Sequence, residues 1–156
     1  MELSIIIINY NTYALTKKCI ETVYEFTKNI ELVYKLAQKN KWTIKTDPKS
    51  LARTMAESDL AIGAPGSMSW ERCMLMLPSV LIAIAENQYQ IGESLNLWNV
   101  ATYLGSYKKF DSATATNAIN NFIQNKDVHE LYSKNAGNLV DGNGPEKIYS
   151  EMRYFL

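Results

Sequence analysis

The sequence has little cysteine and almost no histidine. Its 156 residues include two cysteines, Cys19 and Cys73, and a single histidine, His129. The cysteines lie far apart and belong to no Cys-x-x-Cys or Cys-x-x-His pattern, so they predict two buried, reduced thiols rather than a disulfide framework. One histidine does not suffice for the common zinc sites. We therefore expect no bound metal and no cofactor.

The chain also lacks an excess of charge and a long apolar run. Its 16 basic residues balance 16 acidic ones, and no basic block stands out. A nucleic-acid partner or a membrane surface therefore has no electrostatic support. The apolar run at residues 3–8, which only Ser4 interrupts, is too short for a signal segment or a membrane span. We expect a cytoplasmic protein that binds a small ligand.

Strand-like and helix-like segments alternate along the chain. Hydrophobic residues make up 47% of the sequence, and its length suits one domain over residues 1–156. Short apolar runs predict strands, and apolar residues at helical spacing predict the helices between them. The expected strands are 3–8, 42–45, 60–62, 79–85 and 100–104. The expected helices are 14–28, 30–40 (with a strand at 30–34 as the alternative), 48–58 capped by Asp47, 67–76, 87–97, 112–124, 127–135 and 145–154.

This alternation predicts βαβ units and a parallel sheet with helices on both faces. The expected fold class is therefore α/β, a three-layer Rossmann-like domain with a mostly parallel sheet of about five strands. Ligands of such open sheets bind at the edge formed by the carboxyl ends of the strands.

The most informative segment is the expected turn between a strand and a helix at residues 58–71, Ser-Asp-Leu-Ala-Ile-Gly-Ala-Pro-Gly-Ser-Met-Ser-Trp-Glu. Gly66 has no Cβ, so a phosphate could approach the backbone closely. Ser67 is placed as an N-cap, and the free N–H groups of a first helical turn attract an anion. Ser67 and Ser69 add hydroxyl donors. Glu71, one helical turn after Ser67, could accept hydrogen bonds from two ribose hydroxyls.

Two well-known phosphate loops do not fit this segment. It has no Gly-Lys-Ser/Thr, and Gly63 and Gly66 lack the third glycine of the dinucleotide-binding fingerprint. An ordinary strand-to-helix turn, with a serine cap and a solvated glutamate, remains the alternative to an anion site.

Residues 55–88, MAESDLAIGAPGSMSWERCMLMLPSVLIAIAENQ, carry a resemblance to a known family. From about residue 29 to 156 the chain resembles the C-terminal, nucleotide-binding half of the UDP-sugar hydrolase of pseudaminic acid biosynthesis. That enzyme is a relative of the glycosyltransferases with two Rossmann-like halves. The shared pattern is an acidic-Leu-Ala-Ile-Gly strand, a Gly-Ser-x-Ser-Trp-Glu-Arg-Cys turn and helix, a Leu-Pro-Ser strand and Asn-Gln. Residues 139–144, Leu-Val-Asp-Gly-Asn-Gly, also match a closing region of that family.

The resemblance implies a binding site for UDP or a UDP-sugar. By it, Glu71 would hold the ribose, while Asn87 and Gln88 would meet the sugar or its β-phosphate; a plain helix start is the alternative for these two residues. Thr46 and Asp47 would lie beside the uracil. The residues that would hold the phosphates are Gly66, Ser67, Met68 and Ser69.

The sequence departs from the family in its first part. The family's N-terminal half, with a glycine-rich loop and a catalytic histidine, is absent, and His129 lies in an amphipathic segment that predicts a surface helix. We can name no catalytic base. Residues 1–28 instead resemble the opening strand and helix of single-domain inverting glycosyltransferases, where Tyr10 and Asn11 would lie near the base. The Asp-x-Asp metal motif of those enzymes does not occur.

Three functions remain open at this point. The first, which we favour, is a half-enzyme that binds UDP or a UDP-sugar as the donor in surface polysaccharide or nonulosonic acid biosynthesis. A partner chain would then supply the acceptor or catalytic half. The second is a complete small UDP-sugar hydrolase or glycosyltransferase. The third is a non-catalytic remnant or interaction domain that keeps the fold without binding nucleotide.

Overall fold

The computed structural model describes residues 5–8, 35, 38–39 and 50–154. Contacts divide the chain into one unit of residues 1–9 with 50–156 and a second unit of residues 10–49. In the second unit only Lys35, Gln38 and Lys39 are described, and all three are helical and exposed. The helix expected at 14–28 and the strand expected at 42–45 lie outside the described residues. The prediction of one domain over residues 1–156 stays a prediction.

The first unit contains a parallel sheet whose strands follow one another in chain order, β1-β2-β3-β4. Each of these strands lies within a residue or two of a predicted one, because short β-branched or apolar runs mark strands buried on both faces. They account for four of the five expected strands, and the fifth is the segment at 42–45. The strands are β1 (Ile5–Ile8), β2 (Leu60–Gly63), β3 (Ser79–Ala83) and β4 (Ala101–Ser106).

The helices also follow the predictions, except that the one predicted at 48–58 is shorter and the one predicted at 127–135 continues to Leu139. The first described helix begins at Leu51, and Ser50 is its N-cap, with an Oγ that accepts from the N–H of Arg53 at 3.2 Å. Ser50 therefore takes the cap position predicted for Asp47, which lies outside the described residues. The helices are α2 (Leu51–Ala56), α3 (Met68–Met74), α4 (Tyr89–Leu97), α5 (Ser112–Gln124), α6 (Lys126–Leu139) and α7 (Gly144–Met152), with 3-10 turns η1 (Glu86–Gln88) and η2 (Tyr107–Lys109).

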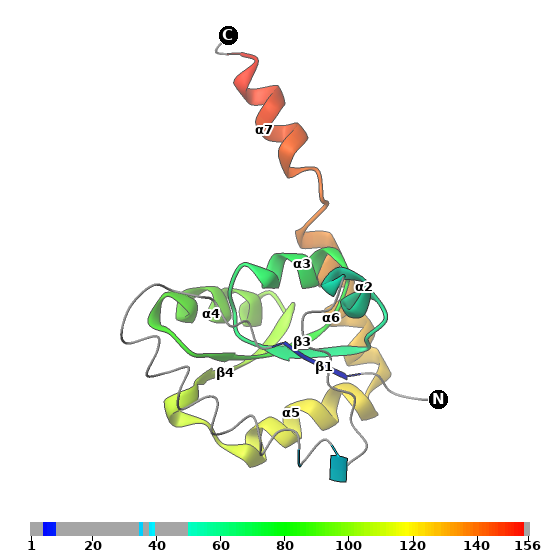
Figure 1. Ribbon diagram of the computed structural model, residues 1–156, viewed down its shortest axis with the longest axis vertical. Coiled ribbons are helices and arrows are strands. Elements are labelled where there is room, and N and C mark those ends of the chain that lie inside the picture. Colours follow the sequence, from blue (N-terminus) through cyan, green and yellow to red (C-terminus); the bar gives the residue numbers. More distant parts are fainter. Residues whose placement is uncertain (1–4, 9–34, 36–37, 40–49, 155–156) are drawn as a thin grey trace. The chain divides into compact units, whose positions relative to one another are not determined.

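Helices cover both faces of the sheet, which confirms the expected layers (Figure 1). On one face, Ala61 of β2 packs with α2 and α3, and Leu81 of β3 packs with Leu95 of α4. On the other face, Val80 of β3 packs with Phe122 of α5. Successive residues of a strand point to opposite faces, so neighbouring positions such as Val80 and Leu81 enter different clusters.

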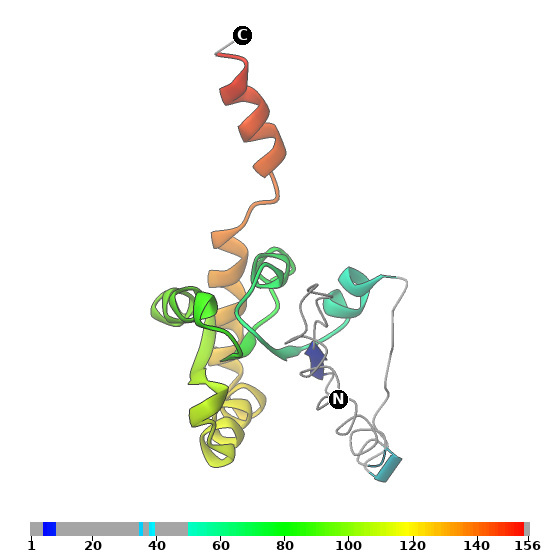
Figure 2. The same cartoon turned by 60° about the vertical axis from the view of Figure 1, so that its left-hand side comes forward.

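Helix α6 joins the two helical layers at the amino ends of the strands (Figures 1 and 2). Its first half packs with α5, and Ala136 in its second half packs with α3 and α4. Three of its side chains bind backbone carbonyls of the residues that precede β2, β3 and β4: His129 Nε2 lies 2.7 Å from Asp59 O, Ser133 donates to Met76 O at 2.6 Å, and Asn135 donates to Asn99 O at 3.2 Å. Helix α6 therefore covers the amino ends of β2, β3 and β4.

Helix α7 differs from the other long helices because it buries none of its residues. Its apolar side chains Ile148, Tyr149 and Met152 are 58 to 66% exposed. Within the part of the chain that the structure describes, no helix has the length and apolar character needed to cross a bilayer.

Candidate functional site

The carboxyl ends of the strands form the edge of the sheet opposite to α6. Loops leave this edge after β2, at residues 64–67, and after β3, at residues 84–85. Because parallel neighbours lie about 4.8 Å apart, these two loops are adjacent. The structure therefore brings the segment around Gly66 and the segment around Asn87 to the same edge, which is where open α/β sheets bind ligands.

The loop after β2 presents two backbone donors that the described residues do not use. Ser69 N donates to Gly66 O at 2.9 Å, and Trp70 N donates to Ser67 O at 3.1 Å. Within residues 50–154 the N–H groups of Ser67 and Met68 have no acceptor. Two adjacent amides without an acceptor among the described residues could donate to the oxygen atoms of an anion.

Gly66 leaves free space in front of these amides. A Cβ built on Gly66 would meet no atom within 4 Å, and its φ is not positive. Neither packing nor backbone conformation in the described residues therefore requires a glycine at this position. The approach of another molecule to the loop would require one.

Ser67 occupies the predicted N-cap position but does not cap α3 with its side chain. Its backbone is already helical, with φ −53° and ψ −36°, and its hydroxyl accepts no capping hydrogen bond. An N-cap side chain reaches the next turn from an extended backbone, which explains the difference. The Ser67 hydroxyl is exposed and remains open to a ligand.

Two other residues that were predicted to contact the phosphates, Met68 and Ser69, point into the protein. The Met68 side chain packs with Met55 and Leu77, and Ser69 is only 2% exposed. The Ser69 hydroxyl accepts a hydrogen bond from Nη2 of Arg72 at 2.9 Å. Met68 can therefore serve a ligand through its N–H group, whereas the Ser69 hydroxyl supports the protein from inside.

Arg72 is the polar residue of this region that sequence reasoning missed. It is 2% exposed, and its Nη2 also donates to the carbonyl of Ala64 at 3.0 Å, in the loop after β2. Its Nε is buried without an acceptor. Burial lowers the pKa of Arg72 to about 10, against the smaller opposing effects of Cys73 and Glu71, so the side chain is charged at neutral pH. The Gly-Ser-x-Ser-Trp-Glu-Arg string contained this residue, but charged side chains are rarely buried.

The remaining predicted contacts at this edge are on the surface. Glu71 and Asn87 are exposed. Gln88 is partly buried, and its Oε1 accepts from Ile84 N at 2.9 Å, which braces the loop after β3. A carboxylate and two amide side chains therefore lie on the elements that follow β2 and β3, and Glu71 and Asn87 are available to a ligand.

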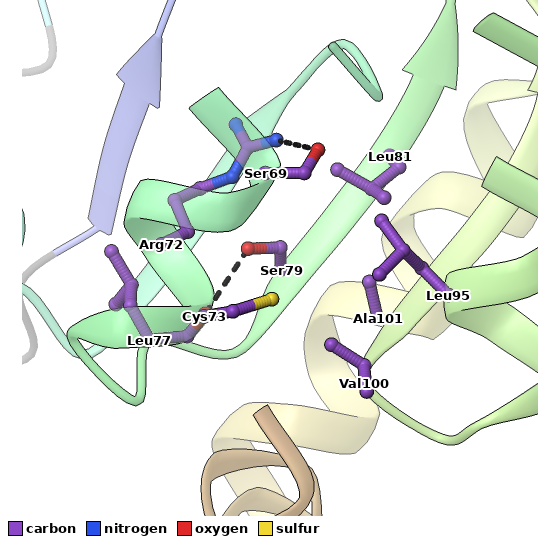
Figure 3. Close-up of a pocket in the computed structure, with 9 residues that line it drawn as sticks. All are labelled: Ser69, Arg72, Cys73, Leu77, Ser79, Leu81, Leu95, Val100 and Ala101. Atoms are coloured by element: carbon purple, nitrogen blue, oxygen red, sulfur yellow. Dashed lines mark hydrogen bonds between the residues drawn. The ribbon is translucent and has the colours of Figure 1, made fainter. Parts of the chain in front are cut away.

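The cavity in Figure 3 is too small to hold a nucleotide. It lies between α3, α4 and the sheet, with a volume of about 10 Å³, and Cys73, Ser79 and Leu95 are among its lining residues. This volume is roughly what one water molecule needs. Figure 3 shows the hydrogen bond between Arg72 and Ser69, two of the residues that line this cavity.

Among the described residues, we identify no catalytic base beside this loop. His129 is half-buried rather than simply on the surface, and it binds the carbonyl of Asp59 before β2. The loop follows β2, and four residues of strand span about 13 Å. Within the described ranges, no three metal-binding side chains of the His, Cys, Asp and Glu types gather.

Thr46, Asp47, Tyr10 and Asn11, the residues expected near the base, lie outside the described residues. The comparisons with known proteins give no family assignment: no protein-family model matches the chain, and no curated protein matches it.

Proposed function

We propose that the chain binds UDP or a UDP-sugar at the carboxyl edge of its sheet, with the loop after β2 holding the diphosphate. The observation that carries this proposal is that the amides of Ser67 and Met68 have no acceptor among the described residues and lie beside the free space at Gly66. Both lie at the strand ends where ligands of this architecture bind. The sequence pattern of residues 55–88 supplies the identity of the ligand.

Glu71 is proposed to bind the ribose. It is exposed and follows the free amides by one helical turn, so a nucleotide whose phosphates meet the amides could present its ribose hydroxyls to this carboxylate. A carboxylate is acceptor-only when ionised and suits a pair of hydroxyl donors. Asn87, on the element after β3, would meet the sugar or the β-phosphate.

Catalysis is proposed to need a partner chain. The described residues offer one wall at this edge, and the single histidine of the sequence is held at the opposite edge by Asp59. General base catalysis requires a group within hydrogen-bond reach of the attacking atom. The partner would supply that group and the acceptor site, which makes this chain the donor-binding half of a glycosyltransferase or UDP-sugar hydrolase.

Isothermal titration calorimetry with UDP tests the proposal, with ADP as the comparison for the base. We expect UDP to bind the wild-type protein and to raise its melting temperature. Gly66→Val should abolish binding because the valine side chain would block the approach to the Ser67 and Met68 amides. Gly66→Ala adds one methyl group and tests the smallest obstruction. Glu71→Ala should weaken binding about 10- to 100-fold, the value of a hydrogen bond to a charged group. Glu146→Ala, an exposed glutamate of α7, is the matched control.

A folded wild-type protein that gives neither heat nor a melting shift with UDP would refute the proposal. It would favour the non-catalytic domain that keeps the fold alone. Release of UDP from a UDP-sugar by the purified chain would contradict the need for a partner.

A further inference from the structure

The side chain of Arg72 is buried, and the packing of the fold does not by itself account for a charged residue at this position. The residue is 2% exposed, and no carboxylate of the described residues forms an ion pair with it. Of its polar atoms, Nη2 has two acceptors and Nε has none. A buried charge without a counter-charge destabilises a protein, and well-packed apolar residues commonly replace such a charge without loss.

The guanidinium of Arg72 contacts the loop after β2. Nη2 donates to Ala64 O, within the loop, and to Ser69 Oγ, at the first turn of α3 (Figure 3). The positive charge of Arg72 therefore contacts the loop that also carries the N–H groups of Ser67 and Met68. Since few water molecules reach this charge, solvent screens it weakly.

We infer that Arg72 is a positioning residue that makes this loop selective for a multiply charged phosphate group. The inference rests on the proposed function, whose site it deepens. Arg72 does not touch the ligand. It fixes the Ala64 carbonyl, so that the neighbouring amides face outward, and its charge favours an anion on the other side of the loop. The ligand's diphosphate is the ion-pair partner that the described residues do not provide.

The test compares ligands that share uridine and differ in charge. Wild-type protein, Arg72→Met and Arg72→Lys are titrated with UDP, UMP and uridine by NMR, which also measures millimolar dissociation constants. In Arg72→Met, UDP should lose affinity at least about tenfold, UMP less, and uridine should be unchanged, since Coulomb energy scales with ligand charge. Arg53→Gln, which removes an exposed cation, is the control and should leave all three constants unchanged.

Two further measurements separate this role from a structural one. Without ligand, Arg72→Met should unfold at the same denaturant concentration as the wild type or a higher one, because an uncompensated buried charge has gone. From pH 7 to 9 the UDP affinity of the wild type should follow only the titration of UDP itself. In Arg72→Lys it should fall over this range, since burial lowers the pKa of a lysine. Of the titratable groups that act on Arg72, the Cys73 thiol stays protonated there because burial raises its pKa to about 11, and Glu71 is common to both proteins.

An equal loss for UDP and uridine in Arg72→Met, or an unchanged UDP constant, would overturn the inference. Inorganic pyrophosphate distinguishes it from the proposed function. If the wild type binds pyrophosphate, and Arg72→Met does not, while UDP binds no better than ADP, the inference stands and the uridine assignment fails. If the wild type binds neither UDP nor pyrophosphate, both fail.

Discussion

The ring of Tyr103 in β4 lies directly against the Cα of Gly92 in α4. A Cβ on Gly92 would lie 2.6 Å from Cδ2 and 2.9 Å from Cγ of this ring. Cγ is the ring atom bonded to Cβ, so the ring can avoid an added methyl group only by changing its rotamer or by moving β4. The close approach lets α4 pack on the sheet, where Asn96 of the same helix accepts from Tyr103 N at 3.0 Å.

Gly92→Ala should therefore destabilise the protein although alanine is the better helix former. Overpacking costs about 1–3 kcal/mol, and the gain in helix propensity returns about 1 kcal/mol of it. Urea unfolding followed by circular dichroism measures the difference. The matched control is Gly144→Ala in α7, where a Cβ would meet no atom within 4 Å and stability should not fall. Equal stability of Gly92→Ala and wild type would show that the ring yields.

The contact of His129 with Asp59 gives a second prediction. The Nε2 atom lies 2.7 Å from the Asp59 carbonyl and connects α6 to the residue before β2. His129→Leu keeps a side chain of similar size but leaves the carbonyl without this partner, which should lower the free energy of unfolding by about 1 kcal/mol. Lys126→Ala, which removes only an exposed ion pair of the same helix, should change it less. An unchanged unfolding midpoint in His129→Leu would contradict the expected value of this contact.

These two contacts show what the sequence could and could not predict. The apolar, β-branched runs at 3–8, 60–62 and 79–85 predicted strands within a residue or two, because burial on both faces leaves a clear pattern in one segment. The helix at 112–124 was predicted with its observed bounds. The bond between His129 and Asp59 joins residues 70 positions apart, and no local periodicity carries information about such a pair.

The candidate site divides in the same way. The glycine and serine pattern placed a loop at the end of β2, and the structure has a loop with two unused amides there. Ser67 and Ser69 looked alike in sequence, but α3 rests on the sheet with Ser69 inward and Ser67 outward. Arg72 is buried because it lies on the same inward face of α3 as Ser69. Contacts of α3 with β2 and β3 set that orientation. Composition alone predicts an exposed arginine.

Helix α7 leads to a third prediction. It buries no residue, and its ion pair between Lys147 and Asp141 is exposed. Ending the chain after Asn143 should therefore change the free energy of unfolding by no more than about 0.5 kcal/mol, as at other surface positions. Ending it after Asn125 also removes α6 with its buried Ala136 and should abolish cooperative unfolding. A large loss on removing α7 alone would mean that the helix packs against the domain in solution.

The burial of Cys73 predicts that the free energy of unfolding falls at alkaline pH. Its thiol is 3% exposed, and burial raises its pKa from 9.0 to about 11, although Arg72 opposes this. Between these values the unfolded chain loses the thiol proton and the folded chain keeps it, so the unfolded state binds fewer protons. The free energy of unfolding should therefore fall as pH rises from 9 to 11, by about 2 kcal/mol from this group.

The difference between wild type and Cys73→Ala isolates that contribution, because lysine, tyrosine and Arg72 titrate in both proteins. The gap between their unfolding free energies should be constant below pH 9 and should change between pH 9 and 11, in the direction that disfavours the wild type. The same burial predicts that iodoacetamide at pH 8 leaves Cys73 unmodified in the folded protein, since the thiolate is the nucleophile. Mass spectrometry of the peptides distinguishes Cys73 from Cys19. Parallel pH profiles of the two proteins, or rapid alkylation of Cys73 before unfolding, would show that the thiol is accessible to solvent.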